Sequence, residues 1–288
     1  KTDLDYITRH VSDWKESAPV LTKHYHKYEL RFTYTKSGAK FPKYVKDKGV
    51  DTVIGVDLGM NTDAVCSVVR KDGTVTGEKF INSPVEKDRM DGLLNTVRKA
   101  QQHGNRKNHR LWRFIDNYNT AIAKKTASEI VSFAVEHHVQ VIVFEHLNMY
   151  GKRYGSKKQR LSLWRKREIQ HRTEDLASRY GIRVSYICAV NTSKLAYDGS
   201  GKVIRGKEAG FKNQQLCVFQ TGKIYNCDLS ASKNIGARYF IRVLLKSMSA
   251  KTLLSVQANV PELDRRTKCT LATLNSCYAV LHTSKTAA

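Results

Sequence analysis

Three acidic residues stand where the sequence predicts that a strand ends or a helix begins. Asp57 closes the run VIGVD, Glu145 follows the apolar run VIVF, and Asp228 lies in YNCDLSASKNIGARY. If these carboxylates converge, they repel one another unless cations lie between them, and hard oxygen ligands select Mg²⁺ or Mn²⁺. Two such ions about 4 Å apart activate water and stabilise the leaving 3′ oxygen in phosphodiester hydrolysis. The pattern predicts a two-metal site in which Asp57, Glu145 and Asp228 are both the catalytic residues and the metal ligands.

Each acid also has a simpler interpretation. A lone Asp after a strand is usually a turn or cap residue, and Asp228 before Ser-Ala-Ser-Lys could be a helix N-cap. Glu145 is harder to explain in this way, because it follows four apolar residues and burial of an unpaired carboxylate is costly. The three acids in this order, within a strongly basic chain, favour the metal site.

Hydrophobic patterns predict the elements that position the acids. Alternating and apolar runs indicate strands, a Lys71-Asp72-Gly73 turn indicates a hairpin, and apolar residues at a spacing of three to four indicate helices. This order predicts a mixed α/β sheet with flanking helices. The predicted elements are a strand at 53–59, a hairpin at 64–81, a helix at 109–138, strands at 139–147 and 182–190, and a helix that begins near Asp228.

Two further patterns give specific expectations about exposure. Residues 24–35 alternate, with Tyr28, Leu30, Phe32 and Tyr34 on one side, and predict a half-buried strand. In the last helix, an apolar face is expected to contain Ile235, Tyr239, Leu244 and Leu245, with Arg238 and Arg242 among the polar positions.

The charge balance points to a polyanionic partner. The chain has 50 Lys and Arg against 26 Asp and Glu, a net charge of +24. Nucleic acid is the commonest such partner, and its binding should weaken steeply with salt. A ribosomal-type structural protein and a membrane-surface binder are the alternatives at this point.

Compartment is indicated by the apolar runs and the cysteines. No apolar run reaches the length of about 18 residues that a membrane span needs. The six cysteines contain no C-x-x-C pair, which predicts reduced thiols of an intracellular protein. The expected localisation is cytoplasmic, in a bacterium and associated with the nucleoid. The chain begins at Lys1, which suggests a fragment of a longer protein.

The segments IGVDLGMNTDAV, VIVFEHLN and YNCDLSASKNIGARY resemble the three RuvC motifs of transposon-encoded TnpB proteins and of compact type V CRISPR effector nucleases. The resemblance covers roughly residues 25–245. It implies an RNase H-like (RuvC) fold in which Asp57, Glu145 and Asp228 bind two Mg²⁺, for which Mn²⁺ can substitute. It further implies an RNA-guided DNA endonuclease, with guide RNA and target DNA as partners.

The same resemblance implies a domain organisation. The recognition lobe and most of the wedge domain are expected upstream of this chain, and the oligomeric state, including a homodimer, is left open. Residues 1–50 are expected to form the C-terminal part of a wedge-type β-barrel. Residues 51–190 are expected to form the RuvC nuclease with its first two motifs and a lid segment at 150–172. A degenerate zinc-ribbon-like insertion that binds target nucleic acid is expected at 191–226, and the third RuvC motif with a C-terminal tail at 227–288.

The insertion departs from the pattern of the family that it resembles. Members usually carry a four-cysteine zinc ribbon here, whereas this chain keeps Cys217 and has Gln220 where a partner is expected. Structural zinc needs four thiolate or imidazole ligands, and Cys188, Cys217 and Cys227 with no nearby histidine do not supply them. The insertion is therefore predicted to fold without zinc.

Basic residues interleaved with aromatic ones are candidates for contact with nucleic acid. Residues 152–172 contain nine Lys or Arg and one acid, with Trp164 among them. A charge run is often only a solvated face, but aromatic interleaving favours backbone contact together with stacking. The candidates are Arg106, Arg110, Lys152, Arg153, Lys157, Lys158, Arg160, Trp164, Arg165 and Arg167.

Several functions remain open from the sequence. The leading prediction is a guided endonuclease. A guided DNA-binding regulator with weak or no cutting is an alternative, although such relatives typically lose one or more of the acids. A guide-independent, structure-selective nuclease and a purely structural RNA-binding protein are the others.

Overall fold

The computed structural model describes residues 14–24, 27–36, 44–105, 107–146 and 165–286. The chain divides into two compact units, Lys1–Lys43 and Tyr44–Ala288. Within the described residues, every helix is too short or too polar to cross a membrane.

The first unit contains two antiparallel strand pairs. Strand β1 (Trp14–Glu16) pairs with β4 (Tyr34–Lys36), and β2 (Val20–His24) pairs with β3 (Lys27–Arg31). The prediction of one half-buried strand over 24–35 is wrong, because the chain forms two short strands there and Tyr28 is 65% exposed. A two-stranded ribbon has a single layer, so both of its faces stay open unless another layer covers them.

The second unit is built on a five-stranded sheet with the order β7-β6-β5-β8-β9. Strand β5 pairs antiparallel with β6 and parallel with β8, and β8 pairs parallel with β9. This is the predicted RNase H-like mixed sheet, and the predicted strands and hairpin are confirmed. The strands are β5 (Thr52–Asp57), β6 (Ala64–Arg70), β7 (Val75–Ile81), β8 (Val141–His146) and β9 (Arg183–Cys188).

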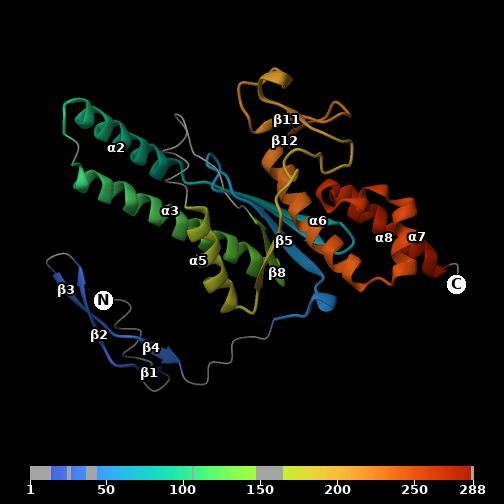
Figure 1. Ribbon diagram of the computed structural model, residues 1–288, viewed down its shortest axis with the longest axis horizontal. Helices are drawn as coiled ribbons and strands as arrows, with labels where there is room; N and C mark the ends of the chain where they lie inside the picture. The colour runs from blue at the N-terminus through green and yellow to red at the C-terminus, as the bar shows by residue number, and fades with distance from the viewer. Residues whose placement is uncertain (1–13, 25–26, 37–43, 106, 147–164, 287–288) are drawn as a thin grey trace. The chain divides into compact units, whose positions relative to one another are not determined.

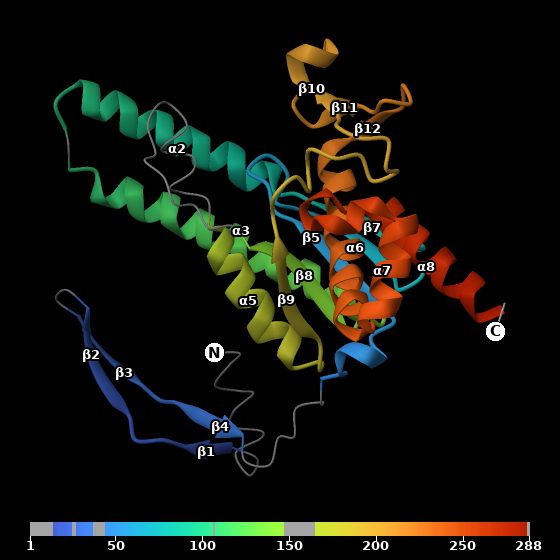
Figure 2. The same cartoon turned by 45° about the vertical axis from the view of Figure 1, so that its right-hand side comes forward.

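Helices cover both faces of this sheet (Figures 1 and 2). On one face lie α3 (His109–Glu136), which confirms the predicted long helix, and α5 (Lys166–Ser178), while α2 (Pro84–Gln102) packs against α3. On the other face lies α6 (Cys227–Ser247), with α7 (Ala250–Asn259) and α8 (Leu271–Thr286) beyond it. The short 3₁₀ helices are η2 (Asp47–Gly49), η3 (Gly206–Ala209), η4 (Pro261–Asp264) and η5 (Arg266–Lys268).

Alternate residues of strand β8 pack into the hydrophobic cores on the two faces of the sheet. Val141 and Val143 belong to the core on the α6 side, whereas Ile142 and Phe144 belong to the core on the α3 side, and all four are fully buried. Successive side chains of a strand point to opposite faces. A continuous apolar run is therefore what a central parallel strand requires.

Helix α6 is buried on all sides over most of its length. Ile235 and Tyr239 are fully buried, as expected for the apolar face, but Arg238, expected among the polar positions, is also buried, at 5% exposed. The helix lies between the sheet and the 3₁₀ and α8 segments, and the Arg238 guanidinium donates to backbone carbonyls there.

The segment between β9 and α6 forms a small three-stranded sheet. Its strands are β10 (Ile204–Arg205), β11 (Leu216–Val218) and β12 (Ile224–Asn226), in the order β10-β11-β12. Phe219, Cys217 and Cys227 form its buried core with Tyr197 and Tyr225 packed against them. Strand β12 leads directly into α6, so this sheet is attached to the helix that carries Asp228.

Candidate active site

Asp57 and Glu145 lie side by side at the ends of two paired strands. Strands β5 and β8 are parallel, with Val56 opposite Phe144, so the next residue of each strand is one of the two acids. Neighbouring strands are about 4.8 Å apart. Since side chains alternate, both carboxylates point to the face that α6 covers, as Val53 and Val143 do.

Helix α6 brings Asp228 to this edge through an unusually close approach to β5. A Cβ on Gly55 would lie 2.6 Å from the Gly236 backbone nitrogen, and a Cβ on Gly236 would lie 2.7 Å from Val69 Cγ2. Asn226 caps the helix, with its Oδ1 accepting from the Leu229 backbone N–H at 2.9 Å. Asp228 is in the first turn and is not the cap, which excludes its simplest structural explanation.

The three carboxylates act on one another electrostatically. Burial raises the pKa of Asp57 most, and the charges of Glu145 and Asp228 raise it further. Burial also raises the pKa of Asp228. Negative charge is therefore concentrated at this edge, in surroundings that disfavour it.

Glu145 is buried, with 8% of the residue exposed, whereas Asp57 and Asp228 are half-buried. Its Oε1 accepts a hydrogen bond from the Thr192 hydroxyl. Burial raises its pKa, while this hydrogen bond and the charges of Arg238 and Lys166 act to lower it. Glu145 is therefore held in one orientation and remains surrounded by groups that stabilise its ionised form.

Asn234 connects this arrangement to α6. Its amide donates to the Thr192 carbonyl at 3.0 Å and to the Leu195 carbonyl at 2.9 Å, and its Oδ1 accepts from the Leu271 backbone N–H. Asn234 is fully buried. It fixes the segment that presents the Thr192 hydroxyl to Glu145.

Arg205 is a residue near the site that the sequence did not single out. It lies on β10, and its charge lowers the pKa of both Asp57 and Asp228. No local signal identifies it, because it follows an irregular Gly- and Lys-rich stretch. Its position depends on how the small sheet folds back over the start of α6.

The donor set suits Mg²⁺ or Mn²⁺, which prefer carboxylate oxygens. Asp57, Glu145 and Asp228 supply such oxygens at one end of the sheet, and divalent charge there would offset the repulsion that raises the pKa of Asp57. Among the described side chains, however, no group of three or more His, Cys, Asp or Glu is arranged closely enough to hold one metal ion. Glu145 instead directs one oxygen to Thr192.

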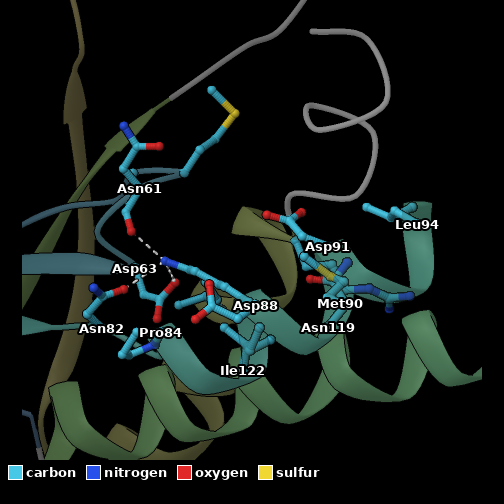
Figure 3. A pocket seen from close by; sticks show the side chains of 16 residues that line it. Asn61, Asp63, Asn82, Pro84, Asp88, Met90, Asp91, Leu94, Asn119 and Ile122 are labelled. Carbon is cyan, nitrogen blue, oxygen red and sulfur yellow. Dashed lines mark hydrogen bonds and ion pairs between the residues drawn. The ribbon is translucent and has the colours of Figure 1, made fainter. Parts of the chain in front are cut away.

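A lysine on α2 fastens the loop that follows Asp57. Lys87 Nζ lies 2.6 Å from Asp63 Oδ1, donates to the Asn61 carbonyl at 2.6 Å and donates to Asn82 Oδ1 at 2.9 Å (Figure 3). The loop is held from the other side by Gln215, whose Nε2 donates to Thr62 Oγ1 at 2.9 Å. The path of the chain from Asp57 into β6 is thereby fixed.

These contacts border a cavity of about 300 Å³ between the loop and helices α2, α3 and α5. Figure 3 shows Asp63, Asp88 and Asp91 among the side chains that line it. Asp63 is 4% exposed, and its Oδ2 has no hydrogen-bond partner among the described residues. The ion pair with Lys87 offsets the free-energy cost of burying the Asp63 carboxylate.

The predicted nucleic-acid contacts divide into three groups. Arg110 and Arg167 are exposed, and the Arg110 guanidinium lies 5.9 Å from the Phe114 ring centroid. Arg165 forms ion pairs with the carboxylates of Asp116 and Glu168. The remaining candidates lie outside the described residues: Arg106, Lys152, Arg153, Lys157, Lys158, Arg160 and Trp164.

Two cysteines, one on the small sheet and one at the start of α6, lie together. Cys217 and Cys227 are buried and their thiols contact each other. Burial raises the pKa of the Cys217 thiol to about 12, and its Sγ donates to the Tyr225 carbonyl at 3.3 Å. Cys188 is exposed at the end of β9.

The chain is similar to known proteins in sequence and in fold. No known protein-family profile matches it. A curated TnpB-like protein of Aquifex aeolicus (strain VF5) is 28% identical over 245 residues, which cover 76% of this chain and 78% of that protein. The predicted resemblance to TnpB proteins is thus confirmed.

Two solved structures share the fold. One is a Cas12f1 chain in an sgRNA–target DNA complex, with a TM-score of 0.50 and 18% identity over 75% of this chain. The other is a CRISPR-Cas12f chain in a ternary complex, with a TM-score of 0.50 and 16% identity over 82% of this chain. The chain spans 55% and 48% of the lengths of these two proteins.

Proposed function

We propose that this chain carries the nuclease site of an RNA-guided DNA endonuclease that hydrolyses phosphodiester bonds with divalent metal ions. One observation supports this most strongly. Asp57 from β5, Glu145 from β8 and Asp228 from α6 lie at one end of an RNase H-like sheet, where the charges of the other two raise the pKa of Asp57.

The roles follow from the contacts of each residue. Asp57, Glu145 and Asp228 would hold two Mg²⁺, which when bound supply the Lewis acidity that phosphodiester hydrolysis requires. Thr192 orients Glu145 through its hydroxyl hydrogen bond. Arg205 places a positive charge beside Asp57 and Asp228, where it would favour the approach of a phosphate and stabilise the charge that develops on it.

RNA guidance is proposed from the relatives and from the charge. The curated relative is a TnpB-like protein, and the Cas12f1 chain was solved with sgRNA and target DNA. The net charge of +24 suits simultaneous binding of an RNA strand and a DNA strand. In such enzymes base pairing to the guide selects the target, while the protein holds the backbone.

The test uses the complete protein purified with the RNA that accompanies it. Target DNA that matches the guide segment of this RNA should be cut in Mg²⁺, and DNA with a scrambled sequence should not. Chelation with EDTA should stop cutting and leave RNA binding intact.

Two outcomes would contradict the proposal. Cutting of branched DNA by RNA-free protein, at the rate seen with RNA, would indicate a guide-independent nuclease. Guide-directed binding with no cutting in Mg²⁺ or Mn²⁺ would indicate a DNA-binding regulator.

A further inference from the structure

Four arginines line a cavity beside the edge strand of the sheet. The cavity has a volume of about 510 Å³ and lies between β9, α6 and residues 265–269. Its arginines are Arg238 and Arg242 on α6, Arg265 between η4 and η5, and Arg266 at the start of η5. None of the described residues that line it is acidic.

The two arginines on α6 are fixed in place by neutral groups. The Arg238 guanidinium donates to the carbonyls of Cys188, Val190, Thr267 and Cys269 at 2.7–3.0 Å. Carbonyl oxygens satisfy the N–H groups but carry no net charge. Arg238, which is 5% exposed, is therefore held in one orientation by neutral groups, and the one carboxylate whose charge acts on it is Glu145, which does not line the cavity.

Arg242 is held in the same manner. It donates to the Tyr186 carbonyl and to Ser185 Oγ, both at 2.8 Å. The carboxylate that acts on it is Asp47, which also pairs with Arg183. One carboxylate thus faces two guanidiniums, and the inner wall of the cavity keeps an excess of positive charge.

Arg265 and Arg266 add exposed charge at the mouth of the cavity. Both side chains are exposed, and no ion pair involves either of them among residues 44–105, 107–146 and 165–286. Arg266 is close enough to Arg242 to disfavour its charge. Neighbouring positive charges repel each other, and an anion bound between them offsets this repulsion. Phosphate suits such a site, because planar guanidinium groups donate to its oxygens in bidentate geometry.

The cavity begins one strand away from the candidate active site. In the pairing of β8 with β9, Glu145 lies opposite Ile187, and His146 lies opposite Cys188. Ile187 and Cys188 both line the cavity. An anion bound there would lie near the carboxylate edge, on the side of β9.

We propose that this arginine cavity binds a backbone phosphate of the DNA strand, next to the phosphodiester that the carboxylates hydrolyse. This inference rests on the proposed nuclease function for the identity of the strand. A merely solvated basic face would leave its arginines mobile, whereas two of these four are buried or half-buried and fixed by six hydrogen bonds.

The test removes the two exposed arginines together, as Arg265→Ala/Arg266→Ala, so that the buried pair stays in place. The matched control is Lys124→Ala/Arg179→Ala, which removes the same charge from exposed positions on α3 and at the end of α5. Affinity for a single-stranded DNA oligonucleotide is measured by fluorescence anisotropy in EDTA over a series of salt concentrations. Thermal unfolding of each variant verifies that it is folded.

The arginine variant should bind DNA about tenfold more weakly than the wild-type protein. The slope of log Kd against log salt concentration should be smaller by about 1.4, as expected when two contacts with single-strand phosphates are lost. The control variant should show less than half of each change. Equal losses in the two variants would overturn the proposal, because only net charge would then matter. A loss confined to an RNA oligonucleotide of the same length would also overturn it, since a guide segment would then occupy the cavity.

This result is separable from the nuclease proposal. Weakened DNA binding with no metal-dependent cutting by the parent protein would support the cavity and refute the nuclease. Metal-dependent cutting by the parent protein, together with unchanged DNA binding by the arginine variant, would support the nuclease and refute the cavity proposal.

Discussion

Gly55 and Gly236 bring strand β5 and helix α6 into backbone contact. A Cβ on Gly55 would lie 2.6 Å from the Gly236 nitrogen and 3.1 Å from its Cα. Beside them, Ser67 and Ser232 share a buried hydrogen bond of 2.5 Å. This contact determines how far Asp228, at one end of α6, lies from Asp57 at the end of β5.

Replacement of Gly236 by Ala should therefore affect both stability and cutting. The added methyl group would collide with Val69, and overpacking of this kind typically costs about 1–3 kcal/mol. We expect a lower free energy of unfolding in urea, together with slower cutting. Gly92→Ala on α2 is the control, because nothing lies within 4 Å of its Cβ. There Ala should stabilise the helix by about 0.5–1 kcal/mol, and a destabilised Gly92→Ala would argue against the packing explanation.

The Asp57 carboxylate should make the metal-free protein less stable as pH rises. Its pKa in the folded state is raised above the unfolded value of about 3.9. Its charge therefore costs nothing below the unfolded pKa, and its full cost appears once pH exceeds the folded pKa. Asp57→Asn should raise the free energy of unfolding in EDTA, and this gain should grow from the acidic to the alkaline end of a series from about pH 5 to 8.

Magnesium should reverse the difference in stability between Asp57→Asn and the wild-type protein. Added Mg²⁺ should stabilise the wild-type protein against thermal unfolding and should stabilise Asp57→Asn less. A gain from Asp57→Asn that did not grow with pH would indicate that the carboxylate is not destabilised in the folded protein.

The ion pair between Lys87 and Asp63 should stabilise the loop after Asp57. The lysine side chain is 20% exposed and the aspartate side chain 5%, so Lys87→Met would leave a buried carboxylate without its partner. Such a change costs about 3–5 kcal/mol, measured as the free energy of unfolding in urea. The double variant Lys87→Met/Asp63→Asn should recover part of the loss. If it were no more stable than the single variant, the ion pair would not explain the effect.

Arg205 should influence the rate of cutting more than the affinity for DNA. Its charge lowers the pKa of Asp57 and Asp228, so Arg205→Gln should raise both pKa values and move the acid side of the pH–rate profile to higher pH. At a fixed neutral pH the cutting rate should fall about tenfold or more. Lys207→Ala, at an exposed position nearby, is the control. Equal effects of the two variants would mean that Arg205 acts only through general charge.

Periodicity predicted the central architecture because the buried strands and the long helix have strong local patterns. Strands β5 and β8 are continuous apolar runs that end in an acid, and α3 shows an apolar stripe that includes Ile115 and Ile130. Those patterns were sufficient to place Asp57 and Glu145 at strand ends and Asp228 at a helix start.

Residues that depend on tertiary contacts could not be predicted in this way. Thr192 and Arg205 belong to irregular sequence. Thr192 reaches Glu145 because Asn234 of α6 holds its segment, and Arg205 acts on Asp57 from the small sheet. Arg238 was expected only among the polar positions of the helix, whereas four carbonyls from the end of β9, the residues after it and residues 267–269 surround it. Alternation over 24–35 predicted a buried face, but burial also requires a second layer, which local alternation does not specify.

The cutting rate of Asp228→Ala tests the central claim most directly. The measurement is single-turnover cleavage of guide-matched DNA in Mg²⁺ by the RNA-loaded protein, with Asp175→Asn, an exposed acid on α5, as the control. We predict that Asp228→Ala retains RNA binding and loses detectable cutting, while Asp175→Asn cuts as the wild-type protein does. Cutting by Asp228→Ala at the wild-type rate would contradict the assignment of the three carboxylates as the metal site.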